Sequence, residues 1–359
     1  MKILFSAETM YPPLGGADIS LITLLNKLGE KHDVRAVYIG EKFGAKFRIL
    51  PQKIKKYKGN WINAFINYWK WKKLVVKLIR EERPDLILTQ ELFTPATVEA
   101  AKKEGVRVAA FVRNNNFASV HGYEFSTPET DKGFWNKMNW KYRIQYPFFL
   151  ILRKKYQEAL RNSEVFSVSE YIKSQLERIN VKSKIIRPFI DTSKYKSKKT
   201  GKKILYIGPS KAKGMDIFFK IVEKMPEREF IVIGNLPKGI KKYKNLEIIS
   251  WTDNMKKIYE KTGLLLVPSR YPDPCPRVVI EAGISGIPSI VSNRGGLPEE
   301  VSAEQVVEDM ESPEQWVEKI KMLDNTKTYR RLSKKALKIS RSFDFKNQYK
   351  LFLEYSGIS

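Results

Sequence analysis

Two carboxylates, Asp273 and Glu281, stand eight positions apart in the stretch Val267–Val301, where an apolar run ends and a proline-rich loop leads into an apparent helix. A carboxylate at such a place can accept two hydrogen bonds from the paired hydroxyls of a ribose or another sugar ring. The alternative is that Glu281 faces solvent and Asp273 only begins a turn. In this setting the pair favours a site for a sugar or a nucleotide.

The helix that follows Pro276 adds a second binding feature. Its first backbone amides, near Arg277 and Val278, have no acceptor within the helix and lie at the positive end of the helix dipole. Such amides can bind a diphosphate. Pro276, Arg277 and Val278 are therefore candidates for contact with a ligand that carries both sugar and phosphate groups.

A glycine pair, Gly15 and Gly16, follows the first apolar run, in the stretch Thr9–Ser20. Glycine has no Cβ, so a ligand can approach the backbone closely, and the start of the next helix favours anions. The pair could also be a tight turn after the first strand, and the two interpretations are compatible. We expect a ligand near this loop.

Both halves of the chain alternate short apolar runs with helix-length stretches. Runs at Lys2–Ala7 and Lys202–Ser210 open the two halves, and each is followed by a turn that contains glycine. This alternation predicts parallel sheets with right-handed crossovers, which bind ligands at the carboxyl ends of their strands. The predicted fold class is therefore α/β, with two Rossmann-like domains.

A stretch rich in Lys, Ser and Thr, Asp191–Lys203, has no apolar periodicity and is typical of a solvated linker. We place an N-terminal domain at 1–193 and a C-terminal domain at 200–342. The tail 343–359 carries aromatic and leucine residues at helical spacing and is expected to pack back on the first domain.

The stretch around Asp273 and Glu281 resembles the signature of the family-four glycosyltransferases, retaining enzymes with the two-domain fold called GT-B. In that family two acids separated by seven residues precede a Gly-Gly-x-Pro-Glu segment, and the first acid is usually Glu. The segment is matched here by Gly295, Gly296, Pro298 and Glu299. The resemblance implies that Asp273 contacts the donor sugar and Glu281 the ribose, in a fold whose two sheets face each other across a cleft.

A second stretch, Ile207–Asp216, is similar to the family's Gly-Arg and Lys-Gly segment after the first strand of the donor domain. Lys213 fits this segment, but Pro209 stands where the family has arginine. The resemblance implies that Lys213 binds the departing diphosphate. Lys211 or Arg270 would then supply the second positive charge, although a loop lysine is often only solvated.

The stretch Thr9–Ser20 looks like the acceptor-domain loop of the same family, whereas Arg113 departs from the family pattern. Many members carry a histidine at this place, and an arginine cannot act as a base at neutral pH. We expect Arg113, with Asn114 beside it, to stabilise phosphate charge or to orient the donor sugar. His121 is a further catalytic candidate.

No pattern of metal ligands follows a strand, so the expected chemistry needs no divalent ion and no cofactor beyond a UDP-, GDP- or ADP-sugar donor. For retaining members the resemblance implies attack on the face from which the nucleotide leaves. The protein would then contribute positioning and charge stabilisation, with Arg113, Lys213 and Asp273 as its catalytic residues.

The chain carries 66 basic and 39 acidic residues, a formal charge of +27, which attracts nucleic acid, anionic lipid and phosphorylated substrates. Its one cysteine, Cys275, favours a reducing compartment. No stretch has the length and apolarity of a membrane span, and the N-terminus lacks the apolar core of a signal peptide. We expect a cytoplasmic protein, peripheral at the inner face of the membrane.

Two segments, 53–83 and 134–156, mix aromatic residues with lysines. This composition suits helices that rest on anionic lipid. The alternative is a pair of core helices with solvated basic faces. Because both segments fall in the expected acceptor domain, they favour a lipid-linked or anionic glycan as the acceptor.

Other functions fit parts of the pattern. A basic nucleic-acid-binding protein would explain the charge, but no known binding module is present and no specific nucleic acid is expected. A nicotinamide-dependent oxidoreductase shares the fold class, but neither opening strand is followed by Gly-x-Gly-x-x-Gly. An epimerase or phosphorylase of the same fold is a third alternative.

Overall fold

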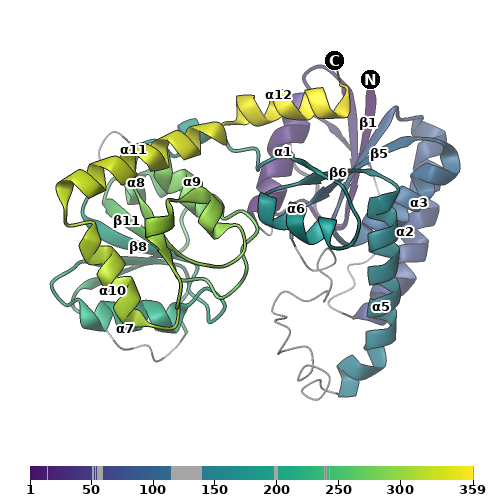
Figure 1. The fold of residues 1–359 in the computed structure, drawn as a ribbon. Helices are drawn as coiled ribbons and strands as arrows, with labels where there is room; N and C mark the ends of the chain where they lie inside the picture. The colour runs from purple at the N-terminus through teal and green to yellow at the C-terminus, as the bar shows by residue number, and fades with distance from the viewer. Residues whose placement is uncertain are drawn as a thin grey trace. The chain divides into compact units, whose positions relative to one another are not determined.

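The computed structural model describes residues 1–13, 15–50, 52, 54, 60–114, 140–197, 201–237, 239, 241 and 243–358, apart from the side chain of Tyr142. The chain forms two compact units (Figure 1). The first comprises Met1–Phe189 and Tyr349–Ser359, and the second comprises Ile190–Gln348. The sequence suggested boundaries at 193 and 343.

The first unit is built on a seven-stranded sheet in which every strand pair is parallel. In spatial order its strands are β3 (Arg48–Ile49), β2 (Asp33–Val37), β1 (Lys2–Ala7), β4 (Leu86–Gln90), β5 (Arg107–Val112), β6 (Glu164–Ser167) and β7 (Lys184–Ile185). Helices lie on both sides of this sheet (Figure 1). The central strand β4 is therefore buried at all its positions, as its apolar sequence requires.

The helices of the first unit fill the connections between these strands. They are α1 (Gly16–Leu28), α2 (Trp61–Glu82), η1 (Glu91–Phe93), α3 (Thr94–Glu104), α5 (Trp140–Arg161) and α6 (Glu170–Glu177). Helix α2 packs on α5, where the ring centroids of Trp61 and Phe149 lie 5.0 Å apart. It also packs on α3, where Lys72 Nζ donates to Glu99 at 2.6 Å.

The C-terminal helix, α12 (Phe345–Ser356), brings an aromatic side chain into the core of the first unit. Phe352 is fully buried, and its ring centroid lies 5.9 Å from that of Phe111 and 5.7 Å from that of Phe166. Arg107 also donates to the carbonyl oxygen of Ser356 at 3.1 Å. The last residues of the chain therefore complete a core that begins with the first strands.

The second unit has a six-stranded sheet, again with every pair parallel. In spatial order its strands are β10 (Leu246–Ile249), β9 (Phe230–Ile233), β8 (Lys203–Ile207), β11 (Thr262–Val267), β12 (Ser289–Ser292) and β13 (Val306–Val307). Relative to the chain this is the order 3-2-1-4-5-6, which defines the Rossmann fold. The loops after β8 and β11 lead from the same edge of the sheet.

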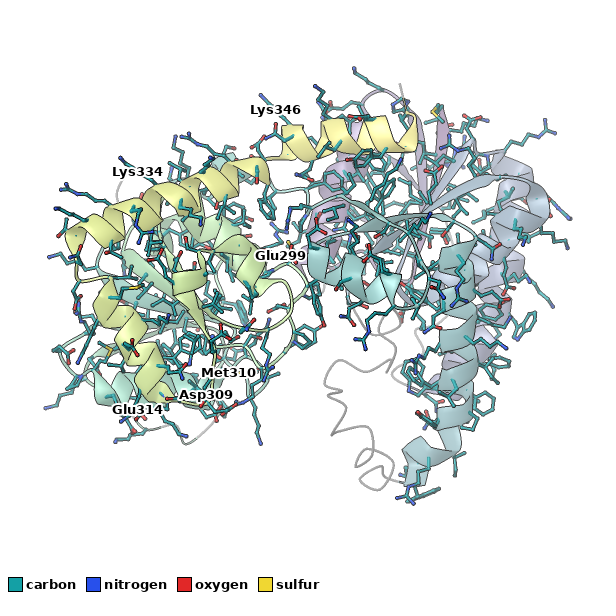
Figure 2. The ribbon with its side chains drawn as sticks, viewed as in Figure 1. Glu299, Asp309, Met310, Glu314, Lys334 and Lys346 are labelled. Carbon is teal, nitrogen blue, oxygen red and sulfur yellow. The ribbon has the colours of Figure 1, made fainter. Side chains whose placement is uncertain are left out.

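Helices flank this second sheet as well. They are η2 (Thr192–Lys194), α7 (Met215–Lys224), α8 (Met255–Tyr259), α9 (Arg277–Gly283), η3 (Leu297–Glu300), η4 (Ala303–Gln305), α10 (Pro313–Met322) and α11 (Thr326–Ser342). Separate apolar clusters form around Phe218 with Trp316 and around Tyr259 with Val279. Helix α11 is strongly basic on its outer side, where Lys334 points away from the unit (Figure 2).

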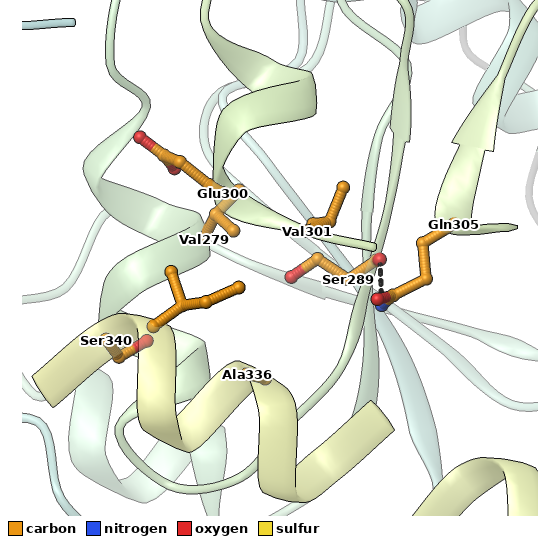
Figure 3. A pocket seen from close by; sticks show the side chains of 8 residues that line it. Val279, Ser289, Glu300, Val301, Gln305, Ala336 and Ser340 are labelled. Atoms are coloured by element: carbon orange, nitrogen blue, oxygen red, sulfur yellow. Dashed lines mark hydrogen bonds between the residues drawn. The ribbon is translucent and has the colours of Figure 1, made fainter. Parts of the chain in front are cut away.

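A narrow space lies between α9, β12 and α11 (Figure 3). Val279, Ser289 and Ser340 line it, among others, and Gln305 donates to the carbonyl oxygen of Ser289 at 2.7 Å. The space is too small to hold a water molecule. It is therefore a gap in the packing of α11 and not a ligand site.

We predict that Phe352→Ala destabilises the first unit by about 3–5 kcal/mol, because it leaves a cavity among buried aromatic rings. The measurement is the urea midpoint of the unfolding transition. Lys350→Ala, an exposed position on the same helix, serves as the control and should change stability by less than about 0.5 kcal/mol. Equal midpoints for the two variants would show that α12 does not support this core.

Candidate functional site

Asp273 lies in the loop after β11, and a glycine pair supports the backbone of this loop. Gly295 has a φ of +59°, and a Cβ added there would lie 2.4 Å from the carbonyl oxygen of Asp273 and 2.5 Å from the carbonyl carbon of Pro272. The amide of Gly296 donates to the same Asp273 oxygen at 2.7 Å. Only glycine fits position 295, so this segment fixes the place of Asp273.

The loop between β8 and α7 is joined to the loop after β11 by backbone contacts. The amide of Arg270 donates to the carbonyl oxygen of Ala212 at 2.8 Å. Gly214 has a φ of +76°, and a Cβ added there would lie only 1.8 Å from the carbonyl oxygen of Pro268. Glycine is required at 214 for the two loops to come this close, and the neighbouring residue is Lys213.

Lys213 and Asp273 meet in an ion pair, in which Lys213 Nζ donates to Asp273 Oδ2. The Asp273 side chain is 15% exposed and that of Lys213 is 36% exposed. The ammonium group also lies 5.6 Å from the ring centroid of Tyr271. Two residues that stand 60 positions apart, expected to bind the sugar and the diphosphate, are thus neighbours.

Glu281 lies within α9 and is 8% exposed, so it does not face solvent as the simpler alternative supposed. Tyr259 donates to its Oε2 at 3.3 Å, and Arg277 Nη2 lies 3.2 Å from its Oε1. Arg277 also donates to the hydroxyl of Tyr195 at 3.2 Å. Burial raises the pKa of Glu281, and the nearby guanidinium opposes that rise.

The start of α9 is formed by Pro276, whose φ of −74° suits the position before a helix. Pro276 is buried, whereas Arg277 and Val278 are half-buried. The Arg277 side chain turns toward Glu281. Its contribution to phosphate binding would therefore come through its backbone amide. Glu299 lies in η3, where its amide donates to the carbonyl of Gly296 at 3.1 Å.

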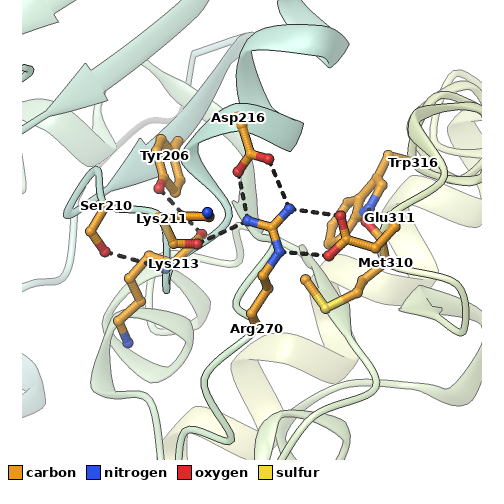
Figure 4. Close-up of polar contacts among 9 residues, drawn as sticks. All are labelled: Tyr206, Ser210, Lys211, Lys213, Asp216, Arg270, Met310, Glu311 and Trp316. Carbon is orange, nitrogen blue, oxygen red and sulfur yellow. Dashed lines mark hydrogen bonds and ion pairs between the residues drawn. The ribbon is translucent and has the colours of Figure 1, made fainter. Parts of the chain in front are cut away.

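Arg270 is held between two carboxylates (Figure 4). Its guanidinium donates to Asp216 at 2.6 and 2.8 Å and to Glu311 at 2.5 and 2.7 Å. It also donates to the carbonyl oxygen of Lys211 at 2.9 Å. Glu311 and Asp216 together raise the pKa of Arg270 above its ordinary value. This arrangement makes Arg270 a clamp on the loop that carries Lys211, whose own side chain is exposed.

Trp251, which follows β10, was not identified from the sequence. Its indole is 61% exposed. Glycines stand beside it at the ends of β8 and β9: a Cβ added at Gly208 would lie 3.7 Å from the indole, and one added at Gly234 would lie 3.3 Å from it. The Trp251 indole thus packs beside two glycines, Gly208 and Gly234, at the carboxyl edge of the sheet. The sequence did contain a signal for this residue: Trp251 comes shortly after one strand, and glycines directly follow two other strands of the same sheet.

In the first unit Arg113 follows β5 and is 9% exposed. Its Nη1 donates to Ser20 Oγ at 2.9 Å and to the carbonyl oxygen of Ala17 at 3.4 Å, and its guanidinium lies 5.0 Å from the ring centroid of Phe111. Arg113 is therefore tied to α1, the helix that follows the glycine pair. His121 lies outside the described residues.

The glycine pair and Asn114 lie at the carboxyl edge of the first sheet. Gly15 has an extended φ of −174°, and a Cβ added there would meet nothing within 4 Å. Neither its conformation nor its neighbours in the first unit require glycine, unlike Gly214 and Gly295. Asn114 Nδ2 donates to Glu91 Oε2 at 2.8 Å, and Glu91 has a φ of +64°. A non-glycine residue seldom takes this conformation outside functional or strained sites.

Among the described residues, no group of three or more His, Cys, Asp or Glu side chains is arranged to hold a metal ion. Within the same residues, no helix has the length and apolarity needed to cross a bilayer.

Comparison with known proteins connects this geometry to a family. The profile described as Glycosyltransferase Family 4 matches residues 14–194, half of the chain, and the one described as Glycosyl transferases group 1 matches residues 190–339. Spore coat protein SA of Bacillus subtilis (strain 168) is 28% identical over 162 residues, 37% of this chain and 43% of that protein. The match thus spans less than half the length of this relative.

Solved structures share the fold. HepE from Anabaena in complex with UDP has a TM-score of 0.73 at 16% identity, covering 99% of this chain and 100% of HepE. Sucrose-phosphate synthase from Thermosynechococcus elongatus has a TM-score of 0.76 at 13% identity, covering 100% of both chains. UDP-GlcNAc 2-epimerase from Neisseria meningitidis also matches, with a TM-score of 0.63 at 14% identity over 100% of both chains.

The predicted fold of two Rossmann-like α/β domains is confirmed by the two parallel sheets and by these neighbours. The fold and the family profiles define a glycosyltransferase of the GT-B class. The chain belongs to glycosyltransferase family 4, as its sequence motifs predicted.

We predict that Arg270→Met destabilises the second unit by about 1 kcal/mol, because Asp216 and Glu311, each about half exposed, then face each other without the cation between them. The measurement is the urea midpoint. Asp216→Asn in the same chain should recover part of the loss. Arg331→Met is the matched control, because Arg331 is 56% exposed and its ion pair among the described residues is with Glu304. A loss as large in the control would contradict the clamp.

Proposed function

We propose that the protein transfers a sugar from a nucleotide-diphosphate sugar to a hydroxyl acceptor, with retention of configuration and without a metal ion. The observation that carries this proposal is the meeting of Lys213 and Asp273 beside α9, which holds Glu281. A cation, a sugar-binding carboxylate and a second buried carboxylate are the groups that a nucleotide sugar requires. UDP is bound in the similar HepE structure.

When the donor binds, its diphosphate would replace Asp273 as the ion-pair partner of Lys213. The ammonium group then neutralises phosphate charge, and the freed carboxylate accepts hydrogen bonds from hydroxyls of the donor sugar. Lys211 supplies the second cation in this proposal, because its side chain is exposed whereas Arg270 is already held by two carboxylates. The amides of Arg277 and Val278 at the start of α9 complete the diphosphate site.

Glu281 would accept hydrogen bonds from the ribose hydroxyls. Tyr259 and Arg277 contact its two carboxylate oxygens and fix their direction. Trp251 lies beyond the glycines at the ends of β8 and β9, and we assign its exposed indole to stacking on the nucleobase. Stacking on an aromatic ring holds any base by its flat face.

The acceptor would be bound by the first unit. We assign Arg113, anchored on Ser20, the role of stabilising phosphate charge or orienting the donor sugar. Asn114, Glu91 and the Gly15–Gly16 loop lie at the same edge of the first sheet as Arg113. We propose a lipid-linked or anionic glycan as acceptor, met at the inner face of the membrane by a cytoplasmic, peripheral protein. Exposed cations in the described parts of these two segments, residues 60–83 and 140–156, support this choice.

The alternatives have less support. Two glycosyltransferase profiles together run from residue 14 to 339, and this favours a glycosyltransferase over a nicotinamide-dependent oxidoreductase or a specific nucleic-acid-binding protein. An epimerase shares the fold, as the Neisseria meningitidis enzyme illustrates. An epimerase would isomerise a free nucleotide sugar without any acceptor, and this difference can be measured.

A thermal-shift screen with UDP, GDP, ADP, CMP and NAD, each with and without EDTA, tests the donor site. We expect one nucleoside diphosphate to raise the melting temperature, because it binds only the native state, and EDTA to leave the shift unchanged. Glu281→Gln should weaken this binding about tenfold or more, since the ribose loses a charged acceptor. Glu318→Gln, an exposed acid on α10, is the control. If none of the nucleotides raises the melting temperature, the result contradicts the proposal.

The role of Trp251 is tested separately by nucleotide titration. We expect Trp251→Ala to weaken binding of the active nucleotide about tenfold, because stacking on an aromatic ring is worth about 1–3 kcal/mol per base. Trp251→Phe should keep most of the affinity, and binding of pyrophosphate should not change in either variant. Ile248→Ala, an exposed neighbour on β10, is the control. Unchanged nucleotide affinity in Trp251→Ala would remove Trp251 from the site and leave the donor function intact.

A further inference from the structure

The outer face of α5 is apolar where a helix of a water-exposed protein is usually polar. Trp140 is 64% exposed and Ile144 is 57% exposed, and Pro147 and Ile151 follow at helical spacing on the same face, with Leu150 beside them. Six of the ten exposed large apolar side chains among the described residues lie on α5 and α2. We call Trp140, Ile144, Pro147, Leu150 and Ile151 the α5 stripe.

The α5 stripe is not the side by which α5 packs into the core of the first unit. The opposite side of α5 already packs into the first unit through Phe149, Leu152 and Tyr156, which are all buried. Helix α2 divides in the same way, with Trp71 buried against Phe93 and Trp69 exposed. The described parts of the two basic aromatic segments, residues 60–83 and 140–156, thus have both a core side and an exposed apolar side.

Cations surround the α5 stripe. Lys141 and Arg143 lie near its start and Lys154 lies past its end, and all three are exposed. Exposed residues 140–154 of α5 include no acid. The adjoining helix α2 exposes a row of cations at helical spacing, made up of Lys70, Lys73, Lys77 and Arg80. Within this row Lys77 pairs with Glu81 at 3.6 Å and Arg80 with Glu104 at 2.9 Å, so lipid phosphates would compete with these two acids. Apolar side chains between cations match the depth profile of an anionic bilayer surface, where headgroups lie above acyl chains.

We infer that the α5 stripe, with the cation row of α2, docks on an anionic lipid surface. Aliphatic side chains such as Leu150 and Ile151 would enter the acyl boundary, and the cations would contact lipid phosphates. A second copy of this chain would bring like charges together, since each chain carries +27. A nucleic acid offers phosphates for the cations but no apolar layer for the stripe. This inference stands on the surface alone and does not rest on the donor chemistry.

Co-sedimentation of the full chain with vesicles tests the inference. We expect binding to vesicles of phosphatidylcholine with phosphatidylglycerol and little binding to phosphatidylcholine alone. Ile144→Gln with Leu150→Gln should weaken binding about tenfold or more, because two exposed apolar side chains that would enter the bilayer are replaced by polar ones. The matched control is Ile19→Gln with Ile248→Gln, two exposed apolar positions elsewhere. An equal loss in this control, or no loss in the test pair, would overturn the inference.

The electrostatic part is tested by charge. Lys70→Gln, Lys73→Gln and Lys77→Gln together should weaken binding about tenfold or more, since each cation near an anionic surface contributes about 1 kcal/mol. Lys334→Gln, Lys335→Gln and Lys338→Gln on α11 remove the same charge from a basic surface without exposed large apolar residues. If both triple variants lose the same affinity, general charge and not this face drives binding. Tight binding of a defined length of RNA, with no vesicle binding, would favour the nucleic-acid alternative.

Discussion

The ion pair between Lys213 and Asp273 is the contact on which the proposed donor site depends. The two side chains come from different loops, and they meet only because the amide of Arg270 binds the carbonyl of Ala212 and because Gly295 lets the Asp273 backbone come close. Each group neutralises the other while no ligand is present. A ligand that takes only the lysine leaves a partly buried carboxylate without its partner, which is unfavourable. A nucleotide sugar can satisfy both groups, because it supplies phosphate oxygens and sugar hydroxyls together.

This constraint explains the different roles of the glycines. At Gly214 and Gly295 a side chain would collide with backbone atoms of the neighbouring loop, so glycine is needed for the loops to join. At Gly15 no described atom would be touched, and the φ angle is one that any residue adopts. A structural need therefore accounts for the first two glycines, whereas the third keeps space free at the end of β1. Free space beside a helix start is what a ligand requires.

The fold could be predicted from the sequence, because strand and helix periodicity are local. The acid spacing is local too, and it led to the hypothesis that Asp273 and Glu281 bind the donor. The role of Arg270 could not, since its partners Asp216 and Glu311 lie 54 and 41 positions away and only the folded unit brings them together. Trp251 was missed for a related reason: one tryptophan after a strand carries no sign of its exposure. For α2 the helical pattern indicated an amphipathic helix, but burial of Trp71 and exposure of Trp69 depend on where α3 and α5 pack.

The excess of positive charge could serve two kinds of binding, to a diphosphate and to lipid. The acids that the structure pairs are used within the fold: Glu99 binds Lys72 and Lys155, and Glu247 binds Lys203 and Lys261. Because 66 basic residues face only 39 acids, many cations are left to create a long-range field. Such a field speeds the encounter with any anion, diphosphate or lipid, but it cannot choose between them. In the functions that we propose, the choice comes from short-range shape: the carboxylate-lined loop would select the donor, and the apolar stripe would select the bilayer.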